Sequence, residues 1–203
     1  MSFTTFVDVA RDIIVSGAAG FTAYFAWKGL SAWKSELEGK ASFEAARMLA
    51  KATYRLRNAI SYCRSPFISS HEFPEEYPGL PTTATSQQEG QAYAHIYGNR
   101  WQPVGAAVQE FEAALLEAEA LWGKEIKAKG EVLRKCVIEL QVDIDCLIQD
   151  KFTGGENFRD KAFAQRVRAT VNATRGEDNA FTTKINDAVE GIETELRPYL
   201  SRA

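Results

Sequence analysis

Residues 13–27, with the sequence IIVSGAAGFTAYFAW, contain no charged side chain. An uncharged run so rich in apolar residues predicts a helix that is buried, either in a bilayer or in a protein core. Fifteen residues make only about 22 Å of helix, whereas a bilayer core is about 30 Å thick. Phe3, Phe6 and Val7 extend the apolar character upstream, and Arg11 and Lys28 can extend their charged ends to the interface. We therefore expect residues 1–32 to form a transmembrane anchor.

Two other interpretations of this run stay open. A secretory signal peptide needs a basic start and a small-residue cleavage site. The segment before the run instead contains Asp8 and Asp12 beside Arg11, and Lys28 follows it, which argues against cleavage. The remaining alternative is a core helix of a soluble protein.

The charges that flank the run predict its orientation. One basic residue precedes it, whereas many follow it: Lys28, Lys34, Lys40, Arg47, Lys51, Arg55, Arg57 and Arg64. The positive-inside rule then places the N-terminus outside the inner membrane and residues 33–203 in the cytoplasm. Lys28, Lys34 and Lys40 are candidates for contact with anionic headgroups. Three cysteines without close spacing suit a reducing compartment.

The sequence of residues 33–203 predicts an all-α fold, in which a helical bundle contains one long amphipathic helix. Apolar residues recur every three or four positions over residues 34–64 and again over residues 104–149. Gly123 and Gly130 allow a kink in the second segment, whose length suggests a hairpin partner or a coiled coil between subunits. Pro66 is expected to end the first of these helices. Proline and glycine then predict a long loop over residues 65–103, with a helical turn or two at 89–97 and a second break at Gly98 and Pro103. A turn at Thr153, Gly154 and Gly155 precedes two shorter helices, expected over residues 158–175 and 181–196, the second capped by Asp178 and ended by Pro198.

Small and hydroxyl side chains in the predicted span suggest helix–helix packing. They are Ser16, Gly17, Gly20, Thr22 and Ala23. Ser16 and Gly20 are four residues apart, a spacing that lets membrane helices approach closely. These five residues are the candidate packing or pore-lining positions.

Sequence motifs for catalysis are absent. The chain has neither a phosphate-binding Gly-x-x-x-x-Gly-Lys loop nor a Gly-x-Ser-x-Gly elbow. His71 and His95 lack the partners of a metal site. The acidic residues Glu139, Asp143, Asp145 and Asp150 indicate either the solvent-facing side of a helix or partners of basic residues on a neighbouring helix, with Lys51, Arg55 and Arg57 as candidates. We expect no enzyme, no catalytic residue, no cofactor and no metal. The net charge of -3 argues against a nucleic-acid partner, although a nucleic acid as a regulatory ligand stays open.

Several segments resemble small single-span bacterial membrane proteins of unassigned function. The resemblance rests on residues 33–40 (WKSELEGK), 46–49 (ARML), 54–60 (YRLRNAI), 64–67 (RSPF), 100–104 (RWQPV) and 115–123 (LLEAEALWG). It covers roughly residues 10–150. Proteins of similar build include the pore-forming transmembrane effector of the Hailong anti-phage defence system. The resemblance implies a membrane effector and no catalytic residues.

Three functions follow as hypotheses. The first is a homo-oligomeric, membrane-anchored protein whose span forms a regulated pore, with the lipid bilayer, further copies of itself and a regulatory ligand or protein as partners. The second is a membrane-tethered adaptor that docks another protein without a pore. The third is an enzyme that uses the loop histidines.

Overall fold

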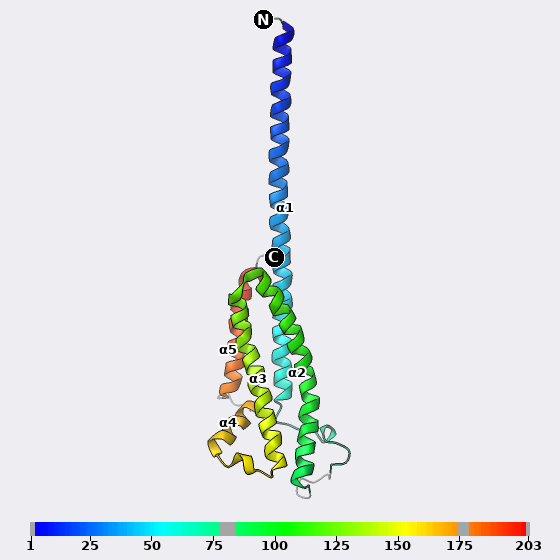
Figure 1. Ribbon diagram of the computed structural model, residues 1–203, viewed down its shortest axis with the longest axis vertical. Coiled ribbons are helices and arrows are strands. Elements are labelled where there is room, and N and C mark those ends of the chain that lie inside the picture. The colour runs from blue at the N-terminus through cyan, green and yellow to red at the C-terminus, as the bar shows by residue number, and fades with distance from the viewer. Residues whose placement is uncertain (1–2, 78–83, 174–178, 202–203) are drawn as a thin grey trace. The chain divides into compact units, whose positions relative to one another are not determined.

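The computed structural model contains five α-helices and two short 3-10 helices in the described part of the chain (Figure 1). They are α1 (Phe3–Cys63), η1 (Ser70–Glu72), α2 (Ser86–Trp122), α3 (Lys124–Phe152), η2 (Glu156–Phe158), α4 (Lys161–Val171) and α5 (Ala180–Leu200). The structure describes residues 3–77, 84–173 and 179–201, with the side chains of residues 3–20, 23 and 32 left out. The chain divides into two compact units, Met1–Glu44 and Ala45–Ala203.

The expectation of an all-α fold is confirmed, because the described residues contain helices and no strand. The apolar stripe predicted over residues 34–64 accounts for the buried face of α1 in the second unit. Ala45, Ala52, Leu56 and Ile60 from that stripe are buried there, together with Leu49. Met48, which belongs to the predicted stripe, is exposed instead. The helix ends at Cys63, three residues before Pro66, as the proline predicts.

The single long helix predicted over residues 104–149 is wrong, because Gly123 divides it into α2 and α3. Gly123 has a φ of 84° and forms the junction of the two helices. This left-handed backbone region is accessible to glycine at no steric cost. The helices then run antiparallel, with Glu112 paired to Arg134 and Glu89 paired to Lys151. A hairpin partner was expected from the length of the predicted helix, and α2 and α3 are each other's partner.

The long loop predicted over residues 65–103 is also too long. Helix α2 begins at Ser86. The Thr85 hydroxyl accepts a hydrogen bond from the Gln88 backbone N–H, and the Gln88 side-chain oxygen accepts one from the Thr85 backbone N–H. This capping box satisfies donors that a helix start leaves free. The helix continues through Pro103, although proline removes one backbone hydrogen bond. Burial of Ile96, Tyr97 and Val104 around it offsets that loss.

Helices α4 and α5 complete the second unit against α3. Asp160 caps α4 by accepting hydrogen bonds from the N–H groups of Ala162 and Phe163. Asn179 caps α5 through the N–H of Thr182, one residue beyond the cap predicted at Asp178. Pro198 lies inside the last turn of α5 rather than after it. The main core joins side chains from α1 to α5, among them Leu56, Phe111, Leu140, Val167 and Ile192.

We expect Gly130→Ala to destabilise the second unit by about 1–3 kcal/mol, because a Cβ at this buried position would lie 2.4 Å from Cδ2 of Leu115, which is itself buried. Gly98→Ala is the matched control. A Cβ there meets nothing within 4 Å, and alanine is favoured over glycine in a helix by about 1 kcal/mol. The urea concentration at the midpoint of unfolding should therefore fall for Gly130→Ala and rise for Gly98→Ala. Equal shifts would show that the α2–α3 contact at Gly130 is not tightly packed.

Candidate functional site

The first unit exposes large apolar side chains on every side of α1. Phe21, Trp27, Leu30 and Trp33 are each more than 60% exposed. Residues of an α-helix follow one another at about 100°, so these four point in four different directions. Charged side chains, Lys28, Lys34, Glu36, Glu38 and Lys40, are interspersed among and beyond them on the same helix. This surface is the first candidate functional surface.

The predicted packing residues are only partly covered by the structure. Ser16, Gly17, Gly20 and Ala23 lie outside the residues whose side chains are described, whereas Thr22 is described and exposed. Among the described residues, no helix combines the length and the apolar character that crossing a membrane requires.

The three basic residues predicted to meet a membrane surface are all exposed. Two of them also have acidic neighbours along the helix. Lys40 Nζ lies 2.7 Å from a carboxylate oxygen of Glu36, and Lys34 Nζ lies 3.9 Å from one of Glu38. The side chains of both pairs are more than 60% exposed, and exposed pairs of this kind contribute little to stability. Lys34 and Lys40 can therefore exchange these partners for anionic headgroups.

Arg100 holds the segment after α1 against α2. Its guanidinium is 2% exposed and contacts both carboxylate oxygens of Glu72, at 2.5 and 2.9 Å. It also donates to the carbonyl oxygens of Ser65 at 2.6 Å and Phe67 at 2.7 Å. The hydrogen bond from Arg100 lowers the pKa of Glu72 below its ordinary value. One buried cation thus fixes the path of residues 65–72.

The aromatic ring of Phe67 lies outside this fixed backbone. It is 75% exposed, the most of any large apolar side chain described. The same segment carries the exposed carboxylates of Glu75 and Glu76. A rigid backbone therefore presents an apolar ring to solvent, with negative charge nearby.

A second buried arginine, Arg64, ties α1 to the junction of α4 and α5. It donates to the carbonyl oxygens of Thr170 and Ala169 and to the side-chain oxygens of Asn179 and Thr182. All of these acceptors, which are its hydrogen-bond partners among the described residues, are neutral. Burial lowers the pKa of Arg64 to about 10, so it remains charged at neutral pH. Neither buried arginine was singled out by sequence reasoning, which treated Arg64 only as one of the basic residues that follow the span.

The acidic residues of α3 have structural partners. Asp143, which is buried, pairs with Arg166 of α4 at 3.1 Å, and Glu139 pairs with Lys184 of α5. Asp150 accepts a hydrogen bond from the backbone N–H of Phe158. The prediction that these carboxylates pair with Lys51, Arg55 or Arg57 is wrong, because α4 and α5, not α1, cover this side of α3. Arg55 instead pairs with Glu110 of α2.

The two histidines lie on different elements and are both exposed. His71 is in η1, and His95 is on α2, where its Nε2 lies 3.0 Å from the Asn99 amide nitrogen. Among the described residues, no group of three or more His, Cys, Asp or Glu side chains is arranged to hold a metal ion.

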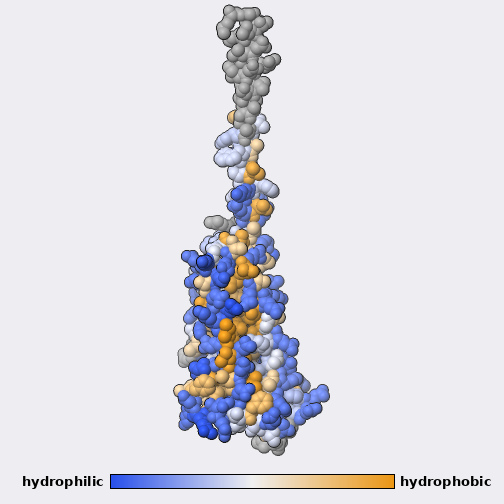
Figure 2. Space-filling view, viewed as in Figure 1, coloured by the Kyte–Doolittle hydropathy of each residue, from blue (hydrophilic) through white to orange (hydrophobic). Residues whose placement is uncertain are grey.

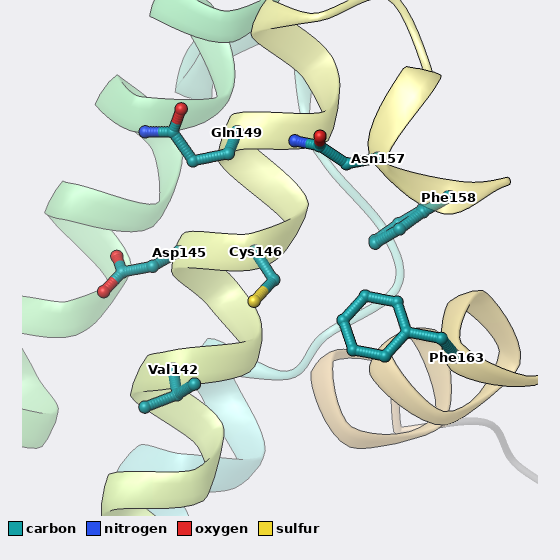
Figure 3. Close-up of a pocket in the computed structure, with 7 residues that line it drawn as sticks. All are labelled: Val142, Asp145, Cys146, Gln149, Asn157, Phe158 and Phe163. Carbon is teal, nitrogen blue, oxygen red and sulfur yellow. The ribbon is translucent and has the colours of Figure 1, made fainter. Parts of the chain in front are cut away.

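An open groove of about 390 Å³ lies between α3 and the η2–α4 segment (Figure 3). Its walls are Val142 and Cys146 on one side and Phe158 and Phe163 on the other. Figure 3 shows the Cys146 side chain on the side of α3 that faces the two rings, while Asp145 lies on the other side of the helix. The groove is therefore an apolar slot with a polar rim.

The groove continues an apolar strip on the surface of α3. Ile138 and Val142, which are 52% and 53% exposed, lie four residues apart on the side of α3 that continues to Cys146 in the groove. Figure 2 shows that apolar residues gather in an orange band along the visible face of the second unit. Such a contiguous strip with a polar rim is typical of an interaction surface.

Basic side chains surround the groove on the α4 side. The guanidinium of Arg166 lies 5.2 Å from the Phe163 ring centre, and that of Arg168 lies 5.8 Å from the Phe158 ring centre. Arg159 and Lys161 are exposed on the same segment. The rim of the groove is thus positively charged where it borders α4.

Comparison with known proteins gives no relative: no family model, no curated protein and no solved structure matches this chain.

Proposed function

We propose that the protein is a homo-oligomeric, membrane-anchored helical protein whose N-terminal helix forms a pore. The observation that carries this proposal is the apolar surface of the first unit. Phe21, Trp27, Leu30 and Trp33 face all sides of α1 and are exposed in the single chain. Full burial of each such side chain is worth about 1.5–3 kcal/mol, so together they favour a bilayer or further copies of the helix strongly.

The order of residues along α1 supports insertion rather than adsorption. The uncharged run comes first, followed by Trp27 and Trp33, and the basic residues Lys34 and Lys40 come last. Aromatic side chains prefer the membrane interface, and basic ones prefer its cytoplasmic side. An interfacial helix would instead separate a polar face from an apolar face. The proposed orientation therefore has the N-terminus outside and the second unit in the cytoplasm.

The small residues of the run, Ser16, Gly17, Gly20, Thr22 and Ala23, support self-association and a pore. The adaptor is the second candidate, and the apolar strip on α3 favours it, because a docked protein could cover Ile138 and Val142. Both functions need the membrane anchor, and only the first needs ion passage. Antiviral defence is the biological role that the resemblance suggests for a pore.

The full-length protein should sediment with membranes, resist extraction at alkaline pH and require detergent. Deletion of residues 1–32 should release a soluble protein, because the second unit, Ala45–Ala203, has its own core. Full-length chain that stays soluble without detergent would overturn the anchor.

Ion flux separates the two candidates. Purified protein reconstituted into liposomes that contain a fluorescent dye should release the dye if the span forms a pore. The matched control is the protein without residues 1–32 at the same concentration. Membrane insertion without release, over a range of protein-to-lipid ratios, would favour the adaptor.

A further inference from the structure

The geometry points to a contact between neighbouring copies in which Phe67 of one chain inserts into the α3–α4 groove of the next. The groove is the one lined by Val142, Cys146, Phe158 and Phe163. This inference rests on the proposed homo-oligomer and specifies how its cytoplasmic units meet.

The first support is the way in which Phe67 is presented. An apolar ring that is 75% exposed is costly in a lone chain, yet its backbone carbonyl is fixed by the buried guanidinium of Arg100. A side chain on so well-anchored a backbone loses little freedom when it binds. Aromatic side chains, phenylalanine among them, are enriched in protein interfaces.

The second support is that Phe67 and the groove lie at similar levels along the helix axes of the second unit. Across the α2–α3 hairpin, Glu112 pairs with Arg134 and Glu89 pairs with Lys151. Arg100 lies about midway between the two glutamates, so it is level with Val142, which lies about midway between their partners. Phe67, held by Arg100, is therefore close to the level of the groove.

The third support is that the two features lie on different sides of the second unit. Figure 1 shows the segment after α1 on the α2 side, whereas α4 lies on the other side of α3. A contact between two different faces of the same chain is heterologous, and it closes into a ring when the rotation allows. Because the two faces are level, rotation about an axis parallel to the helices would keep every bundle pointing the same way, as a single membrane requires.

The fourth support is charge. The segment that carries Phe67 also carries the exposed Glu75 and Glu76. The α4 side of the groove carries the exposed Lys161 and Arg168, besides Arg159, which pairs with Glu156. Opposite charges at the rim of an interface favour the correct register and faster association. The same chain thus provides both halves of a complementary contact.

Cysteine cross-linking of the full-length protein in detergent tests this contact. In Phe67→Cys, the new thiol should react with Cys146 of the neighbouring chain through a short bismaleimide and give a ladder of covalent oligomers. The other native cysteines should not interfere, because Cys63 and Cys136 are buried and burial raises the pKa of both thiols, that of Cys63 to about 11. The ladder should disappear in Phe67→Cys with Cys146→Ser. Asn186→Cys, exposed on α5, is the matched control and should give no ladder.

Co-expression gives a sharper result. The double variant Phe67→Cys with Cys146→Ser has only the donor thiol, and the unsubstituted chain has only the acceptor thiol. Cross-linking of the mixture should therefore stop at a covalent dimer that contains one chain of each kind. A covalent dimer formed by the double variant alone would show that position 67 of one chain meets position 67 of another, and it would overturn the inference.

Phe67→Asp provides a test without cross-linking. It should raise the concentration needed for assembly by about tenfold or more, because a buried aromatic contact is lost at each interface. Mass photometry of the unsubstituted chain separates the two proposals. A chain that is monomeric throughout would remove the homo-oligomer itself. A stable oligomer that Phe67→Asp leaves unchanged, with no cross-link to Cys146, would remove only this contact.

Discussion

Replacement of Arg100 by methionine should reduce the free energy of unfolding of the second unit by about 3–5 kcal/mol. Methionine keeps much of the volume but removes the partner of the Glu72 carboxylate and the donors to the Ser65 and Phe67 carbonyls. Breaking a buried ion pair by removing one partner has a cost of this size. Chemical unfolding monitored by circular dichroism measures it.

Arg134→Met is the matched control for this prediction. Arg134 also contacts two carboxylates, those of Glu112 and Glu131, but its side chain is 47% exposed. Exposed pairs contribute about 1 kcal/mol or less, so this variant should unfold close to the unsubstituted protein. Similar losses for the two variants would show that burial of Arg100 is not what makes its contacts strong.

The Arg100–Glu72 pair also predicts how stability changes in acid. The pKa of Glu72 in the folded protein lies below its ordinary value of 4.5, chiefly because Arg100 hydrogen bonds to the carboxylate. A depressed pKa means that the pair contributes fully above pH 4.5 and loses this contribution as the pH falls through the folded value. Glu72→Gln should therefore flatten the dependence of stability on pH in this range.

Gly20→Leu should disrupt the oligomer and, with it, ion flux. Packing of small residues is the main attraction between membrane helices, and a leucine at Gly20 would force the backbones apart. Each lost contact is worth about 1–2 kcal/mol, and a ring repeats the loss in every subunit. Mass photometry in detergent and dye release from liposomes measure the two consequences.

Ala18→Leu is the control for Gly20→Leu. Two residues along a helix differ by about 160° in direction, so this leucine should face away from the Ser16–Gly20 side and leave the oligomer intact. An oligomer that survives Gly20→Leu would assign assembly to the cytoplasmic units. Loss of the Phe67 cross-link in the same variant would show that the two contacts form together.

The sequence determined much of the helical content, because it depends on local spacing. The stripe over residues 34–64 predicted the buried face of α1, and Pro66 predicted its end, since both signals act within a few residues. The turn at Thr153, Gly154 and Gly155 followed from glycine in the same way. The sequence did not predict that α2 continues through Gly98 and Pro103, because burial of Ile96, Tyr97 and Val104 outweighs the local preference for a break.

The burial and the partners of the charged residues became known only from the tertiary structure. The sequence indicated Arg64 only as one of the basic residues after the predicted span and gave Arg100 no role, and only their packing shows that both are buried and hold loops in place. The carboxylates of α3 pair with Arg166 and Lys184, which are 23 and 45 residues away. No periodic pattern encodes such distant partners.

The same distinction applies to function. The sequence by itself determined that residues 13–27 are uncharged, that basic residues follow them and that no catalytic motif is present, because these are properties of composition and order. Only the tertiary structure decided that Gly123 turns one predicted helix into a hairpin, that Phe67 is exposed on a fixed backbone and that Cys146 lies in an apolar groove. Those features depend on which helices pack together, and packing is set by side chains that are far apart in the chain.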